Sequence, residues 1–354
     1  MQEKYLIGMQ CTVKEAIEKM ELEQIKAVVI VDKQNRVAGL FSNGDMRTFF
    51  LRGGSLHANI CDAMNRHPVL FHSEEEVRKE RQNTVRVIYP IVDQDTKIIS
   101  ILDDNRSNFN GKINDALKDI PLVIMAGGKG TRLYPYTRIL PKPLIPIGDI
   151  TITERIIHSF QKYGCQEVIM ILNHKANMIK AYMSELEKDY TIQFAEEKEF
   201  LGTAGGLKLI EHQVHSTFFL SNCDILIDAD LECIYKTHKA KGNRITFVCS
   251  VKDVVIPYGV VETDQDGMIT HLKEKPGFSF LINTGLYMIE PDVMQDIQKG
   301  EFIHLPDLAQ RYLDRGEKVG VFPISEKAWM DMGQFQEMDN MIKTLGLQAE
   351  DSMG

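Results

Sequence analysis

The sequence lacks the features that mark nucleic-acid-binding, membrane and secreted proteins. Its formal net charge is −9, whereas a protein that binds a nucleic acid needs a basic surface to neutralise the phosphates. No apolar run approaches the roughly 18 residues of a membrane-spanning helix, and no charged-then-apolar leader opens the chain. We therefore expect a cytoplasmic protein with neither a nucleic-acid partner nor a membrane partner.

Paired cysteines and an unusual composition are also missing. The six cysteines are scattered without the spacing of a disulfide framework or a zinc site, as expected for reduced thiols. A hydrophobic content of 44% with 26% charged residues is typical of a soluble globular protein. A length of 354 residues predicts two or three domains.

A glycine-rich segment is the most informative part of the chain. The apolar run at 122–125 (LVIM) predicts a buried strand, and the residues that follow it are Ala126, Gly127, Gly128, Lys129, Gly130, Thr131 and Arg132. Glycines allow a sharp turn and a close approach to a ligand. Successive exposed N–H groups in such a turn form an anion site, which two cations would reinforce. The segment therefore predicts a phosphate-binding loop.

Two common phosphate loops do not match this segment. A Walker A loop needs Ser or Thr directly after Gly-Lys, and Gly130 stands there. A dinucleotide fingerprint needs a third glycine where Leu133 stands. Four prolines follow, at 135, 141, 143 and 146, and predict an extended path without a regular helix, with Lys142 on a stiff backbone. An ordinary surface loop with solvated charges remains the alternative.

Two acidic residues follow apolar segments that are far apart in the chain. Asp224 comes after the apolar strand predicted at 217–220, and Asp331 lies in the segment WMDMG near the C-terminus. Magnesium prefers carboxylate, water and phosphate oxygens as ligands. If the two residues converge, they predict a Mg²⁺ site. The alternative is that each only caps a turn or a helix.

The last two thirds of the chain alternate between helix and strand patterns. Helices are predicted at 153–163 and 176–187, and further strands at 167–172, 190–195 and 268–272. Such alternation predicts an α/β fold with a mixed, mainly parallel, Rossmann-like sheet flanked by helices. Ligands then bind at the carboxyl ends of the strands, where the glycine loop lies.

The segment GGKGTRLYPYTRILPKPLIPIGD resembles the signature of the sugar-1-phosphate nucleotidyltransferases, which join a nucleoside triphosphate to a sugar 1-phosphate and release pyrophosphate. The resemblance extends from about residue 121 to about residue 340. It implies that Arg132 binds the β- and γ-phosphates, Lys142 the α-phosphate region and Lys275 the sugar phosphate. It also implies that Asp224 and Asp331 hold Mg²⁺. Because the nucleophile is already anionic, positioning and electrostatic stabilisation should carry the catalysis.

The same resemblance assigns the remaining contacts. Nucleotide-binding residues would be those of the glycine loop from Ala126 to Thr131, with Glu197, Gly202, Thr203, Ala204 and Asn222. Sugar-binding residues would be Gly259, Glu274, Asn283 and Thr284. Phe200 stands where the family often has a proline, which leaves the course of the loop at 201–206 open.

The first 115 residues contain an internal repeat. Residues 30–32 (IVD) recur at 91–93, and the apolar segment 37–41 matches 98–102. This pattern resembles a tandem pair of cystathionine-β-synthase-type (CBS) domains, β-α-β regulatory modules that bind nucleotides. We predict repeats at 1–58 and 59–115, a linker at 116–120 and a transferase domain at 121–354.

Only the first repeat keeps the residues that bind a nucleotide in the CBS family. Ser42 and Asp45 match the phosphate and ribose contacts, whereas Asp103 and Arg106 stand at the corresponding positions of the second repeat. We expect at most one regulatory site, for an adenine or guanine nucleotide. The alternative is a scaffold for a homo-oligomer (dimer or tetramer) that binds no ligand.

Substrate identity is less constrained by the sequence. The fusion of a CBS pair to this transferase resembles bacterial guanylyltransferases that act on glucosamine 1-phosphate or a related hexose 1-phosphate in nonulosonic (legionaminic) acid synthesis. Glu197 could accept hydrogen bonds from guanine N1 and N2, which favours GTP, and CTP or UTP remains open. A nucleotide-sensing protein without activity is the other alternative, although Arg132, Lys142, Asp224 and Asp331 are all present.

Overall fold

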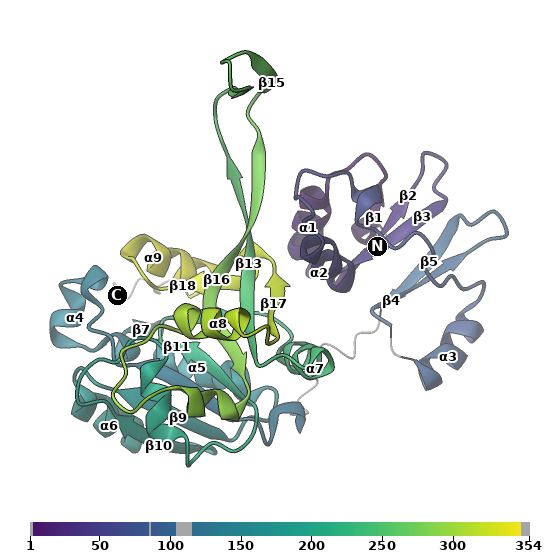
Figure 1. Cartoon of the computed structure of the whole chain (residues 1–354). Helices are drawn as coiled ribbons and strands as arrows, with labels where there is room; N and C mark the ends of the chain where they lie inside the picture. Colours follow the sequence, from purple (N-terminus) through teal and green to yellow (C-terminus); the bar gives the residue numbers. More distant parts are fainter. Residues whose placement is uncertain (1–2, 85, 104–114, 348–354) are drawn as a thin grey trace, which may run out of the picture. The chain divides into compact units, whose positions relative to one another are not determined.

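The computed structural model describes residues 3–84, 86–103 and 115–347 (Figure 1). The chain divides into two compact units, the first formed by Met1–Gly111 with Val251–Leu281 and the second by Lys112–Ser250 with Ile282–Gly354. Arg106, named in the predicted second repeat, lies outside the described residues. Within the described part of the chain, no helix has the length and apolar character needed to cross a membrane.

Two antiparallel hairpins with flanking helices make up most of the first unit. Its elements are β1 (Leu6–Gly8), α1 (Val13–Leu22), β2 (Ala27–Val31), β3 (Val37–Ser42), α2 (Asn43–Leu51), α3 (Glu74–Asn83), β4 (Ile88–Val92) and β5 (Ile98–Asp103). The second hairpin starts 61 residues after the first (88 against 27, and 98 against 37). Each hairpin has a register shift at the same place, between Ile30 and Val31 and between Ile91 and Val92. Helix α1 begins at a capping box formed by Thr12 and Glu15.

The rest of the first unit is a long hairpin, which we call the arm (residues 251–281). It comprises the outer part of β13 (Ile245–Val255), β14 (Val260–Thr263), β15 (Ile269–Lys273) and the start of β16 (Gly277–Ile289). The arm is the green hairpin labelled β15 in Figure 1. Strands β14 and β15 form a sheet of only two strands, and many of their side chains are exposed.

A seven-stranded sheet organises the second unit, in the order β10-β9-β6-β11-β16-β13-β17. Its remaining strands are β6 (Leu122–Ala126), β9 (Glu167–Leu172), β10 (Thr191–Glu196), β11 (Phe218–Asn222) and β17 (Val319–Ile324). Strands β10, β9, β6 and β11 are parallel, β16 is antiparallel to β11, and β13 is parallel to β17. The predicted mixed, mainly parallel sheet is confirmed.

Helices and short strand pairs complete the second unit. The helices are α4 (Tyr136–Ile139), α5 (Ile152–Gln161), α6 (Ala176–Glu185), α7 (Leu231–Lys241), α8 (Leu305–Asp314) and α9 (Phe335–Thr344). The strand pairs are β7 (Pro146–Ile147) with β8 (Ile150–Thr151), and β12 (Ile225–Ile227) with β18 (Trp329–Asp331). The helices predicted near 153–163 and 176–187 correspond to α5 and α6.

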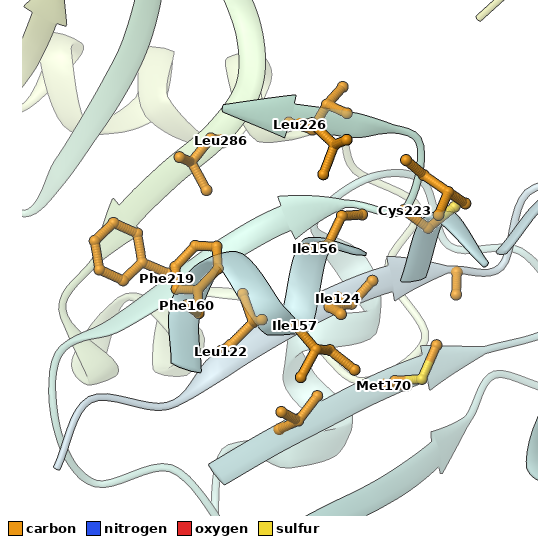
Figure 2. Packing of buried hydrophobic residues seen from close by; sticks show 14 of the residues in the cluster. Leu122, Ile124, Ile156, Ile157, Phe160, Met170, Phe219, Cys223, Leu226 and Leu286 are labelled. Atoms are coloured by element: carbon orange, nitrogen blue, oxygen red, sulfur yellow. The ribbon is translucent and has the colours of Figure 1, made fainter. Parts of the chain in front are cut away.

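Both faces of the sheet are buried. On one face, Leu122, Ile124 and Met170 pack with Ile156 and Phe160 of α5 (Figure 2). The opposite face carries a second core, to which alternate residues of the same strands contribute. Burial on both sides explains why these parallel strands are continuous apolar runs in the sequence.

The segment predicted as a linker packs onto this core. Leu117 is fully buried in the core that contains Ile156 and Phe160 of α5. Its amide donates a hydrogen bond of 2.8 Å to the carbonyl oxygen of Tyr163.

Candidate active site

The glycine loop lies at the carboxyl edge of the parallel strands. Strand β6 ends at Ala126, which is in register with Leu172, the last residue of β9. On the other side of β6, Asn222 at the end of β11 is in register with Met125. Because these strands are parallel, the loops that follow them leave the sheet at the same edge, where an open α/β sheet binds its ligands.

The extended path predicted after the glycine loop is wrong. The chain instead forms three short helical turns, at Thr131–Leu133, Tyr136–Ile139 and Lys142–Leu144. Prolines cap or begin the last two turns, and a proline is tolerated in the first turn of a helix, where its missing N–H has no partner to lose. The prolines therefore limit the length of these turns without preventing them.

The loop packs directly against Lys142. Gly130 has a φ of +64°, and a Cβ there would lie 3.1 Å from the Cβ of Lys142. The Lys142 ammonium group forms an ion pair with the carboxylate of Asp224, and the two side chains are only 14% and 19% exposed. The glycine loop, Lys142 and Asp224, which were predicted from separate motifs, are thus brought together. Lys129 and Arg132 are exposed.

Asp331 is the last residue of β18, and Asp224 directly precedes β12, the strand that pairs with β18. Strand β12 starts directly after Asp224 and pairs with β18 so that Ile225 is in register with Asp331. The amide of Met332 donates a hydrogen bond of 2.8 Å to the carbonyl oxygen of Asp224. Burial raises the pKa of Asp331, and the negative charge of Asp224 raises it further, while Lys142 opposes both. The two carboxylates are therefore close enough to repel each other.

This pair has the chemistry of a Mg²⁺ site that is completed by substrate. No group of three or more His, Cys, Asp or Glu side chains is placed to hold a metal ion in the described part of the chain. Magnesium commonly binds to one or two carboxylates and takes its other ligands from phosphate and water. Two repelling carboxylates with one shared cation, Lys142, fit that pattern.

Glu197 is a buried carboxylate at the same edge. It follows the last residue of β10, its side chain is 5% exposed, and neither carboxylate oxygen has a hydrogen-bond partner among the described residues. Burial raises the pKa of Glu197 to about 7, and the backbone of Leu201 opposes this shift. A buried polar group without a partner is costly, so this carboxyl group is available to a ligand.

Two glycines make room for Glu197. A Cβ at Gly127 would lie 2.6 Å from one carboxylate oxygen, and a Cβ at Gly206 would lie 2.5 Å from the other. Phe200 borders the same space, because its ring carbon Cδ2 is 3.6 Å from the Cβ position of Gly127. Phe200 is 44% exposed, and its ring lies edge-on to that of Phe302 at 6.1 Å.

The loop after Glu197 is bound to α8 and the segment before it. Gly202 has a φ of +83°, and the amide of Ala204 donates to the carbonyl oxygen of Ile303 (3.1 Å). The hydroxyl of Thr203 accepts a hydrogen bond from the amide of Leu305 (3.0 Å). Thr203 and Ala204, which we predicted to bind nucleotide, thus have structural contacts of their own.

Asn222, Asn283 and Thr284 lie together where β11 meets β16. The side chain of Asn222 fills the space beside Gly285, where a Cβ would lie 2.4 Å from its nitrogen. The Thr284 hydroxyl is buried and donates to the carbonyl oxygen of Val248 (2.8 Å). Asn283 donates to the hydroxyl of Tyr287 (2.8 Å). The hydroxyl proton of Thr284 is therefore already used in a hydrogen bond within the sheet.

Gly259, Glu274 and Lys275 lie on the arm, in the first unit. A Cβ at Gly259 would lie 3.1 Å from a carboxylate oxygen of Glu274, so these two predicted sugar-binding residues are neighbours. Lys275 has a φ of +44°, and its amide donates to the carbonyl oxygen of Tyr258 (3.2 Å).

Ser42 and Asp45, the predicted regulatory residues, form a capping box at the start of α2. A carboxylate oxygen of Asp45 accepts hydrogen bonds from the Ser42 amide (2.9 Å) and hydroxyl (2.6 Å). Asp45 also lines a cavity of about 440 Å³ with residues that include Phe49, Arg52 and Asn65.

Two residues that hold the backbone near the candidate site were not predicted from the sequence. Asn173 donates to the carbonyl oxygen of Glu197 (2.9 Å). The ammonium group of Lys175 donates to the carbonyl oxygens of Arg138 and Ile139 (2.7 Å each) and so holds the end of α4. Lys175 adopts a φ of +56°, which nothing in its sequence context indicates.

Comparison with known proteins supports one family. Residues 122–345 match the model of the family described as nucleotidyl transferase. The chain is 32% identical over 234 residues to a UTP–glucose-1-phosphate uridylyltransferase of Synechocystis. It is also 32% identical over 226 residues to a mannose-1-phosphate guanyltransferase of Pichia angusta. Each match covers 60% of this chain and 60% of the relative, so the chain spans less than two thirds of the length of these relatives.

Solved structures show a similar fold. A structure described as that of a glucose-1-phosphate thymidylyltransferase from Bacillus anthracis matches with a TM-score of 0.52 at 20% identity, covering 65% of this chain and 96% of the other. HddC from Yersinia pseudotuberculosis matches with a TM-score of 0.50 at 22% identity, covering 64% and 99%.

Proposed function

Because the chain belongs to the nucleotidyl transferase family, we propose that it condenses a nucleoside triphosphate with a sugar 1-phosphate and releases pyrophosphate. The observation that carries this proposal is the meeting of Lys142, Asp224 and Asp331 beside the glycine loop. Enzymes that transfer phosphoryl groups commonly hold the polyphosphate with cationic side chains together with a metal ion.

The charges suggest how the reaction is assisted. The sugar phosphate is an anion that attacks another anion, so repulsion and the charge on departing pyrophosphate oppose the reaction. Arg132 would bind the β- and γ-phosphates, Lys142 the α-phosphate region, and Lys275 the sugar phosphate. Asp224 and Asp331 would hold Mg²⁺, which neutralises charge on the phosphate oxygens when it is bound. Lys142 would then exchange its contact with Asp224 for one with a phosphate.

GTP is the proposed nucleotide. A carboxylate with two free oxygens matches the adjacent N1–H and N2–H donors of guanine, and both oxygens of Glu197 lack partners within the described residues. A cytosine amino group or a uracil N3–H would use one oxygen and leave the other buried without a bond. CTP and UTP are the alternatives, and the relatives include both uridylyl and guanyl transferases by name.

Glucosamine 1-phosphate, or a related hexose 1-phosphate, is the proposed second substrate, used for precursors of surface glycans and nonulosonic acids. Glu274 and Gly259 on the arm, with Asn283 and Thr284 on β16, would contact the sugar. A carboxylate oxygen of Glu274, which would accept hydrogen bonds from sugar hydroxyls, lies beside Gly259. Because Gly259 has no side chain, it does not block this oxygen.

Residues 1–115 are proposed to be a CBS pair that binds a regulatory nucleotide near Ser42 and Asp45. The cavity of about 440 Å³ beside Asp45 supports this. Against it, the Asp45 carboxylate already bonds to Ser42. The alternative, a homo-oligomer scaffold, would be indicated if the purified chain is a dimer or tetramer that binds no nucleotide at this unit.

Pyrophosphate release tests the proposal. The purified chain with Mg²⁺ would be incubated with ATP, CTP, GTP or UTP and a panel of hexose 1-phosphates. We expect release that requires both substrates, is fastest with GTP and is lost in Lys142→Ala. If the chain binds a nucleotide but releases no pyrophosphate with any pair of substrates, this result would support the nucleotide-sensing protein instead.

A further inference from the structure

The arm depends on its base for its position. Beyond the seven-stranded sheet it is a two-stranded hairpin, and a hairpin of two strands is marginally stable alone in water. Apolar side chains near its end are exposed, among them Tyr258, Met268 and Leu272. Whatever holds the base of the arm therefore controls where Glu274 and Lys275 can lie.

Asp253 is the main polar contact at that base. Its side chain is 9% exposed and bonds to the ammonium group of Lys14 (3.0 Å) and to Nε2 of His57 (2.8 Å). Burial by itself would raise the pKa of Asp253, but the two partners hold it below its usual range. A carboxylate this buried has a high cost when it loses its partners, so the contact resists opening.

Further contacts hold both strands of the arm. On β13, Val251 is buried in the core of the first unit with Val13 and Ile17. On β16, the Ser279 hydroxyl oxygen accepts a hydrogen bond from the amide of Leu56 (2.9 Å). Gly277 lies against His57 so closely that a Cβ there would be 1.9 Å from Nε2.

The residues that hold the arm are joined to one another within the first unit. The amide of Val13 donates to the carbonyl oxygen of Ala58 (3.0 Å), and that of Lys14 donates to the carbonyl oxygen of Leu56 (2.9 Å). The first turn of α1 and the segment 55–58 are thereby joined. The arm is attached to this combined surface and not to a single side chain.

We infer that Asp253, held by Lys14 and His57, is a positioning residue for the transfer reaction, through which the first turn of α1 and the segment 55–58 set the affinity for the sugar 1-phosphate. This inference rests on the proposed function, because it takes Glu274 and Lys275 as sugar-phosphate contacts. The glycine loop, Glu197 and Asp224 belong to the second unit and do not depend on this attachment. Loosening the arm should therefore weaken the binding of the sugar 1-phosphate and leave the binding of the nucleotide unchanged.

The test compares KM values in the full-length chain. Asp253→Asn removes the charge and keeps the shape of the side chain. We expect KM for the sugar 1-phosphate to rise about ten-fold, as the loss of one charge-assisted hydrogen bond would produce. KM for the nucleotide should change less than about two-fold, and Asp253→Glu should restore part of the loss. An unchanged KM for the sugar 1-phosphate, or equal changes in both KM values, would overturn the inference.

One control variant tests for a general effect of the charge change, and two further variants serve if Asp253→Asn does not fold. Glu75→Gln makes the same charge change in an exposed ion pair with Lys79 on α3 (3.3 Å) and should leave both KM values as they are. If Asp253→Asn fails to fold, His57→Gln and Lys14→Met each remove only one partner of Asp253 and should give smaller effects in the same direction.

A measurement independent of activity separates this inference from the proposed function. Hydrogen–deuterium exchange of amides at 260–273 should become faster in Asp253→Asn, while exchange at 167–172 in the sheet stays the same. If the wild-type chain releases no pyrophosphate with any substrate pair, the proposed function fails. The attachment of the arm would still be tested, and unchanged exchange at 260–273 would overturn it.

Discussion

The amide of Met332 donates a hydrogen bond to the carbonyl oxygen of Asp224, and this bond ties together two motifs that are far apart in the chain. It continues the pairing of β12 with β18, in which Ile225 is in register with Asp331. The two acidic side chains are thus fixed by backbone pairing. The proposed Mg²⁺ site would therefore be preorganised, because backbone pairing holds the two carboxylates near each other before any ion binds.

The first prediction concerns these two carboxylates. Asp224→Ala and Asp331→Ala should each lower pyrophosphate release by about 10²–10³-fold, the usual loss when one group that stabilises transferring charge is removed. Titration with Mg²⁺ should show a higher requirement in each variant. Circular dichroism would check that the variants are folded. Near-normal release by either variant would contradict the proposed role of that residue in holding Mg²⁺.

The second prediction concerns the glycines around Glu197. Gly127→Ala and Gly206→Ala each place a Cβ within 2.6 Å of a Glu197 oxygen, and forced overpacking costs about 1–3 kcal/mol. Thermal unfolding should show a lower Tm for both. Gly128→Ala is the matched control for stability, because nothing lies within 4 Å of its Cβ position. Equal Tm values for the three variants would contradict the close packing.

The sequence was a good guide to the elements of the second unit. The glycine loop, the parallel strands and the predicted helices follow from apolar runs and their spacing, because both faces of the sheet are buried. The sequence motifs also indicated which distant residues lie together, since Lys142 and Asp224 were assigned to one phosphate site and form an ion pair. The roles of individual predicted site residues stay predictions.

Other features could not be read from the chain. The short turns after the glycine loop depend on contacts such as the bond from the Thr137 hydroxyl to the Gly130 carbonyl oxygen (3.0 Å), whereas single prolines suggested an extended path. Asp253 and His57 lie in unremarkable sequence, and only the fold brings them together. Long-range pairing of this kind leaves no periodic pattern, so sequence reasoning has no means to find it.

A third prediction follows from the pKa of Glu197, which is raised from 4.5 to about 7. An unfolded chain loses this proton near 4.5, whereas the folded chain keeps it until about pH 7. Glu197 thus adds stability below pH 4.5 that is lost as the pH rises through 7, on the order of 1–3 kcal/mol. Glu197→Gln should abolish this loss, so its Tm should exceed that of the wild type at pH 8 more than at pH 5.5. An equal difference in Tm between Glu197→Gln and the wild type at both pH values would contradict this prediction.

A buried polar cluster at the other end of the sheet has the opposite pH dependence. His238 is fully buried, and its ring contacts the Thr246 hydroxyl (2.8 Å) and the Glu290 carboxylate (3.1 Å). Lys239 and Thr217 also bond to Glu290. Burial lowers the pKa of His238, with Lys239 and Arg244 adding to the effect and Glu290 opposing it.

The fourth prediction is therefore a loss of stability in mild acid. The unfolded chain takes up a proton on His238 near its ordinary pKa of 6.5, while the folded chain resists it, so the stability that His238 contributes above that pH is lost as the pH falls. His238→Gln removes this titration. The decrease in Tm from pH 7.5 to pH 5.5 should be smaller in the variant than in the wild type. His212, whose side chain is exposed, provides the control: His212→Gln should leave the decrease in Tm between pH 7.5 and pH 5.5 as it is in the wild type.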